Sequence, residues 1–166
     1  MRDIYPTPVV STSTTPAVTR WRDFDGNGID DLALFRNGSW WVRYSDGTTT
    51  TFTFGSDSWP RTIPVAGDWD GDGVDGIGTY TAATATWTLR QTASAGAADA
   101  GTVGFGTPGA TYPVVGDWNG DGVDSIGLKA LQGTGWSLRN TNAGPVEVSF
   151  DYGLANDLPI TWRVAV

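Results

Sequence analysis

Three short segments of this chain carry the same pattern of oxygen-bearing side chains and glycines. They run over residues 23–31, 68–75 and 117–124, with Asp or Asn at the first, third and fifth positions and Gly at the fourth and sixth. Glycine allows the tight winding that turns those side chains toward one centre, where oxygen ligands suit a hard cation. The pattern predicts about three Ca²⁺ sites, with the side-chain ligands Asp23, Asp25, Asn27, Asp68, Asp70, Asp72, Asp117, Asn119 and Asp121.

The acidic residues of the chain are concentrated in these loops. Each of the first two loops holds four and the third holds three of the 18 acidic residues, in a chain of net charge −8. Surface turns also favour Asp, Asn and Gly, but a turn needs only one or two of them, and clustered like charges repel without a cation. An EF-hand would need Glu at position 12, where this chain has Leu34, Thr79 and Leu128. We therefore favour metal binding over plain turns.

The loops belong to a longer internal repeat, because they recur at intervals of 45 and 49 residues. Two further markers keep nearly the same period. They are a Trp-to-Arg segment and an aromatic-Gly pair, at residues 40–43, 87–90 and 136–139 and at residues 54–55, 105–106 and 152–153. A period of 40 to 50 residues with several short strands is typical of a propeller blade. The chain is predicted to be all-β, with three repeats forming β-propeller-type blades of four antiparallel strands.

The repeat also predicts the domain organisation. Residues 1–15 are expected to form an extended Ser/Thr/Pro-rich linker, and residues 16–166 the three-repeat module. The units are expected at about 16–60, 61–110 and 111–157, followed by a closing strand over 158–166. In the second unit we expect strands near residues 63–69, 76–81, 86–92 and 102–105, with the acidic loop between the first two. The repeated arginines are interpreted as structural, while a ladder lining a ligand groove is an open alternative: Arg43, Arg90 and Arg139.

The Phe-Gly pairs, the proline that follows each of them, and the acidic loops together resemble the FG-GAP or VCBS repeat. This family comprises the calcium-binding blades of integrin α-subunit propellers and of many secreted bacterial proteins. The resemblance covers roughly residues 16–160. It implies that the carbonyl at loop position 7 and a carboxylate at position 9 complete each site, which points to Ile29, Val74 and Val123 for the carbonyl and to Asp31 for the carboxylate.

The second and third loops depart from that ligand set. Gly76 and Ser125 stand at position 9, while Asp75 and Asp124 stand one residue earlier. Either position 8 supplies the last acidic ligand in these loops, or the two sites are weaker.

Three blades do not close an ordinary propeller ring, which generally has about four to eight. Two chains could combine to give about six blades, since a lone module would expose its end faces. The chain could also be an atypical three-unit monomer capped by its terminal strand, or a fragment of a larger propeller. In the tail, Pro159 aligns with Pro64 and Pro113, but Arg163 stands where the next loop would begin.

Composition narrows the function classes. The acidic charge argues against nucleic acid as a partner, and no apolar run is long enough for membrane insertion. The chain lacks His and Cys, which removes a conventional triad, a thiol nucleophile and a thiolate metal site. We expect a non-catalytic protein. A secreted, calcium-rich location suits such loops, although no signal peptide is present in this chain.

The sequence thus favours a non-catalytic calcium-binding repeat module with structural, adhesive or protein-interaction roles. A carbohydrate-binding, lectin-like module is the alternative, because aromatic side chains near the connections and ends could stack on sugars: Trp21, Trp59 and Trp162. A calcium-dependent polysaccharide-active enzyme is the least favoured hypothesis. The expected partners are calcium, a homo-oligomer, and a glycan or protein ligand.

Overall fold

The structure, a computed structural model, describes residues 22–55 and 62–161. These residues form eleven β-strands and no helix, which confirms the expected all-β class. The strands make three antiparallel sheets, none of them closed into a barrel, and in each sheet the strands follow one another in chain order. The first sheet contains β1 (Leu32–Arg36), β2 (Ser39–Arg43) and β3 (Thr49–Thr53). The second contains β4 (Thr62–Gly67), β5 (Gly76–Thr81), β6 (Thr86–Arg90) and β7 (Gly101–Gly104). The third contains β8 (Thr111–Gly116), β9 (Ser125–Ala130), β10 (Gly135–Leu138) and β11 (Val148–Asp151).

Local sequence explains these meanders. In β6, apolar Trp87 and Leu89 alternate with Thr88 and Arg90, and only the two apolar side chains are fully buried. The hairpin between β1 and β2 turns at Asn37 and Gly38, which both have positive φ (52° and 78°). An Asn-Gly turn of this kind matches the natural twist of a two-residue hairpin. Period-two patterning and turn chemistry thus set each sheet.

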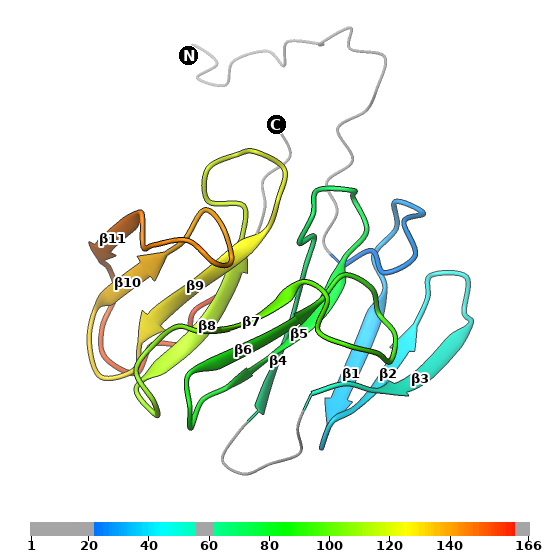
Figure 1. The fold of residues 1–166 in the computed structure, drawn as a ribbon, viewed down its shortest axis with the longest axis horizontal. Coiled ribbons are helices and arrows are strands. Elements are labelled where there is room, and N and C mark those ends of the chain that lie inside the picture. Colours follow the sequence, from blue (N-terminus) through cyan, green and yellow to red (C-terminus); the bar gives the residue numbers. More distant parts are fainter. Residues whose placement is uncertain (1–21, 56–61, 162–166) are drawn as a thin grey trace, which may run out of the picture.

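The core lies between the sheets, and the second sheet is the central one (Figure 1). One apolar cluster joins the first sheet to the second, with Trp40 and Val42 packed beside Ile77. The other joins the second sheet to the third, with Trp87 beside Ile126. Strands β4 and β8 also contact each other directly. The first and second sheets therefore each bury one face against the sheet that follows in the chain.

The strands expected in the second unit are confirmed to within two residues. The linker over 1–15 and the start of the first unit lie outside the described residues, and the first sheet has three described strands. Residues 158–161 of the expected closing strand belong to no sheet, and the rest of that strand lies outside the described part. Thr161 instead contacts β8 by a side-chain bond, its hydroxyl donating to the carbonyl of Val115 at 2.9 Å. The described part of the chain contains no helix long and apolar enough to cross a membrane.

The repeated arginines brace the loops that follow their strands. Arg43 donates to the carbonyl of Gly47 (3.1 Å), and Arg90 donates to that of Ala97 (2.7 Å) and pairs with Asp99 (3.1 Å). Arg139 donates to the carbonyl of Asn142, in the loop that follows its strand, at 3.3 Å. Its guanidinium carbon lies 3.9 Å from the centroid of the Phe105 ring. These contacts support the structural interpretation of the three arginines over a ligand ladder.

Candidate metal centre

The first aspartate of each acidic loop organises the loop backbone. In all three loops its Oδ1 accepts the N–H of position 4 at 2.7 Å. Its Oδ2 accepts the N–H of position 6 at 2.7, 2.9 and 2.9 Å. Both donors are glycines with φ between 76° and 92°, a region that other residues rarely adopt. The aspartate and the two glycines thus form one unit, and this unit occurs three times.

Position 5 fixes the second half of each loop. Its Oδ1 accepts the N–H of position 7 at 2.8 Å from Ile29, 2.8 Å from Val74 and 2.9 Å from Val123. This bond holds position 5 on the same side of the turn as position 1. These hydrogen bonds involve the backbone N–H of position 7. The role of its carbonyl as a metal ligand remains a prediction.

The structure brings two sets of carboxylates together as predicted. Asp23, Asp25 and Asp31 place one oxygen each within 4.8 Å of one another, and so do Asp68, Asp70 and Asp72. The third loop has the same backbone but only two carboxylates among its predicted side-chain ligands, because Asn119 stands at position 3. Three carboxylate oxygens at such separations suit a hard divalent cation. The first two loops therefore fit such a cation better than the third.

Asn side chains donate hydrogen bonds to carboxylates in the first and third loops. In the first loop, Asn27 Nδ2 donates to Asp25 Oδ2 and to the Ser45 hydroxyl, each at 2.9 Å. In the third, Asn119 Nδ2 donates to Asp121 Oδ2 at 2.8 Å. The second loop has carboxylates at positions 1, 3 and 5 and no amide among them. Its three carboxylates at these positions therefore receive no hydrogen bond from an amide side chain of the loop itself.

Position 9 differs between the loops for steric reasons. Asp31 accepts the N–H of Phe24 and the N–H of Ser45, both at 2.8 Å, which aims its carboxylate back at the first loop. Gly76 lies so close to the carbonyl of Arg90 and the ring of Trp69 that a Cβ would collide with them. Ser125 is buried and donates its hydroxyl to the Arg139 carbonyl. Only the first loop therefore has room for a carboxylate at position 9.

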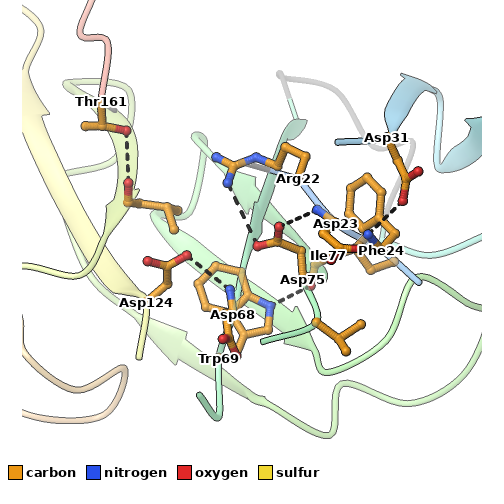
Figure 2. A network of polar contacts seen from close by, with 12 residues as sticks. Arg22, Asp23, Phe24, Asp31, Asp68, Trp69, Asp75, Ile77, Asp124 and Thr161 are labelled. Carbon is orange, nitrogen blue, oxygen red and sulfur yellow. Dashed lines mark hydrogen bonds and ion pairs between the residues drawn. The ribbon is translucent and has the colours of Figure 1, made fainter. Parts of the chain in front are cut away.

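In the second and third loops, the acidic residue at position 8 binds the preceding loop (Figure 2). Asp75 Oδ2 accepts the N–H of Asp23 at 2.8 Å, and the Asp75 N–H donates to the Asp23 carbonyl at 2.7 Å. Asp124 makes the same pair with Asp68, at 3.1 and 2.7 Å. We call each reciprocal pair an inter-loop clasp. Asp75 and Asp124 thus belong to contacts between repeats, and neither joins the carboxylate group of its own loop among the described residues.

The sequence carries one signal of the clasps, although it does not identify them. An acidic residue occurs at position 8 in every loop, as Asp30, Asp75 and Asp124, even where position 9 is not acidic. Such constancy indicates a shared role, but the partner lies 52 residues away in the first clasp and 56 in the second. Only the packing of neighbouring sheets shows which backbone the carboxylate meets.

Burial dominates the electrostatics of the first clasp. It raises the pKa of Asp75 to about 6, against the opposing effects of Arg22, whose guanidinium lies 3.9 Å away, and of the Asp23 N–H. Burial also raises the pKa of Asp68, although the N–H groups of Gly73 and Gly71 favour its charged form. Acidic groups held partly out of water in this way gain from a cation nearby.

The clasp predicts a stability difference between two substitutions. Asp75→Ala removes the acceptor and leaves the buried N–H of Asp23 unpaired, so it should lower the free energy of unfolding by about 1–3 kcal/mol. Asp75→Asn keeps an acceptor oxygen on a side chain of the same shape. It should lower the free energy of unfolding much less in the metal-free protein, because burial already favours the neutral form of this side chain. Urea unfolding of both variants in chelator measures the difference. Equal losses would contradict the clasp.

No family model, curated protein or solved structure matches this chain. The fold and the loops define the protein as an all-β chain with three repeated acidic loops, which contact one another between neighbouring sheets.

The tryptophans considered for sugar stacking lie outside the described residues: Trp21, Trp59 and Trp162.

Proposed function

We propose that this chain is a non-catalytic, calcium-binding repeat module whose sheets act as β-propeller-type blades of the FG-GAP or VCBS kind. One observation carries the proposal: each loop repeats the same Asp-glycine unit, and two of the loops gather three carboxylate oxygens within 4.8 Å. In this proposal Asp23, Asp25 and Asp31 hold one cation, and Asp68, Asp70 and Asp72 hold a second. The position-7 carbonyls complete the coordination.

Calcium has a mechanical consequence in this arrangement. The aspartate at position 1 of each of the first two loops offers its side chain to the cation and its backbone to the clasp of the next repeat. A cation that fixes this aspartate therefore also fixes the contact between sheets. Because an unfolded chain cannot assemble the loop, binding free energy adds to folding free energy. Calcium would rigidify the whole module.

The proposed role is structural, adhesive or protein-binding, in a secreted protein. The absence of His and Cys from the sequence and the use of most acidic residues in the loops argue against catalysis. Its proposed partners are calcium and a protein or glycan ligand, together with a second copy of the chain.

Calorimetric titration of chelator-stripped protein with Ca²⁺ tests the proposal. We expect two tighter sites, from the first two loops, and a weaker third site, because the third loop has one carboxylate fewer. The Asn119→Asp variant should tighten the third site alone, by about tenfold or more, since it restores a charged ligand. Mg²⁺, which demands a smaller octahedral site, is the matched cation control. Absence of Ca²⁺ binding in all three loops would overturn the proposal.

A further inference from the structure

The two ends of the row of sheets expose large apolar side chains, and the middle does not. Among the described residues, the eleven exposed large hydrophobic side chains all lie at positions 29–41 or 146–160. None lies between residues 62 and 110, in the repeat that has a neighbour on both sides. Exposed apolar surface gathered in this way marks an interaction site. The question is which partner fits both ends.

Repeat equivalence identifies what covers such positions inside the chain. Counted from the first aspartate of each loop, Leu32 is equivalent to Ile77 and Ile126, which are fully buried, whereas Leu32 is 69% exposed. Leu34 is 72% exposed, and its equivalents are Thr79 and Leu128, exposed by only 1% and 4%. Ile77 and Ile126 are covered by the preceding repeat. The first sheet presents the same surface with no preceding repeat among the described residues.

This surface is a defined face of the first sheet. Leu34 pairs across the ladder with Trp41, and Leu32 with Arg43, so these side chains share one face. Trp41, on the central strand of the sheet, is 36% exposed, and Arg36 stacks over its ring at 5.3 Å. We call the surface formed by Leu32, Leu34 and Trp41 the leading face.

The third sheet exposes the complementary surface. Trp40, Trp87 and Trp136 each donate an indole N–H, at 3.0 Å, to the carbonyl of the following aromatic residue. In the first two repeats that residue is Phe54 or Phe105, and both are buried against the next repeat.

In the third repeat the aromatic residue is Tyr152, which is 71% exposed. Phe150, stacked on Trp136 with 5.8 Å between the ring centroids, is 43% exposed. We call the surface formed by Trp136, Phe150 and Tyr152 the trailing face.

We propose that a second copy of this chain docks head to tail, so that the trailing face of each copy packs on the leading face of the other and the two chains close into a pair. The partner is a second copy because each chain exposes both sides of a sheet-to-sheet contact that already occurs twice within the chain. A head-to-tail contact gives a closed assembly when the rotation between the units allows it, and a closed pair leaves neither apolar face exposed. The proposal does not depend on calcium.

Sedimentation velocity of the chain, with and without Ca²⁺ and over a range of concentrations, tests the pairing. The expected species has twice the 17.6 kDa mass of one chain. Leu34→Asp and Tyr152→Asp each place a charge in the centre of one face, and both should raise the dissociation constant by about 30-fold or more. Both side chains are more than 70% exposed, so each variant should keep its fold, which its melting curve checks.

Mixing the two variants separates a head-to-tail contact from dimers of another geometry. Each variant should pair more weakly with itself, but the trailing face of Leu34→Asp and the leading face of Tyr152→Asp are intact, so the mixture should recover association through one native contact. Thr107→Asp, on the exposed connection between the second and third repeats, is the charge-matched control and should pair normally. A strict monomer, or a dimer that survives either single variant, would overturn the proposal. Calorimetry then decides separately whether the calcium sites exist.

Discussion

Removing calcium is expected to lower the melting temperature of this protein by about 10 °C or more. A ligand at 100 times its dissociation constant stabilises the native state by about 2.7 kcal/mol per site, so two filled sites contribute about 5 kcal/mol. For a chain of this size each kcal/mol corresponds to roughly 2–4 °C. The effect should be large here because the loops proposed to bind the cation also contain the clasped aspartates Asp23 and Asp68. Scanning calorimetry in calcium and in chelator, at matched ionic strength, measures the shift.

A pair of matched variants ties this shift to the second loop. Asp70→Asn combined with Asp72→Asn removes the charge from two predicted ligands and should abolish roughly half of the calcium increment. Glu147→Gln combined with Asp151→Asn makes the same charge change outside the loops and keeps oxygen acceptors for Asn140 and Thr134. The control should retain the full increment. Identical melting curves with and without calcium in the wild-type protein would show that the loops are not stabilising metal sites.

Gly76→Ala is expected to destabilise the fold by about 4 kcal/mol or more, or to prevent folding. The backbone of Gly76 does not have the positive φ that disfavours alanine. The new methyl group, however, would collide with the carbonyls of Arg90 and Gln91 and with the ring of Trp69. Two of these neighbours are backbone atoms in or beside β6, which cannot move without breaking the sheet. Overpacking that forces backbone shifts is among the few causes of such large losses. Denaturant unfolding, or the soluble yield where no folded protein is obtained, measures the effect.

Gly104→Ala provides the comparison for this substitution. Gly104 ends β7, and a Cβ there would have nothing within 4 Å. Alanine should therefore change the free energy of unfolding by no more than about 0.5 kcal/mol. If Gly76→Ala proves equally mild, then Gly76 is not sterically required and the absence of a carboxylate at position 9 needs another explanation.

Local pattern in the sequence determined a large part of this protein. The strands of the second unit follow from alternation such as Trp87 and Leu89 against Thr88, and the loop geometry follows from Asp and Gly at fixed spacing. The carboxylate group of the second loop is predictable for the same reason, since positions 1, 3 and 5 lie in one short turn, and the group of the first loop adds Asp31 from position 9 of that loop. These features depend on neighbours within about ten residues, so the sequence displays them directly.

Only the tertiary structure decided how the repeats meet. From the sequence, Asp75 is one of two alternatives for the last ligand of its own loop, and only the structure shows that it binds the backbone of Asp23, because two sheets pack side by side. Gly76 reads as a missing ligand, and its crowding by Arg90 shows why none fits. Leu34 and Leu128 are both leucines at equivalent positions, but one is exposed and the other is buried. The residue types alone could not separate these cases, because burial is set by the sheet that covers a position, which lies many residues away in the chain.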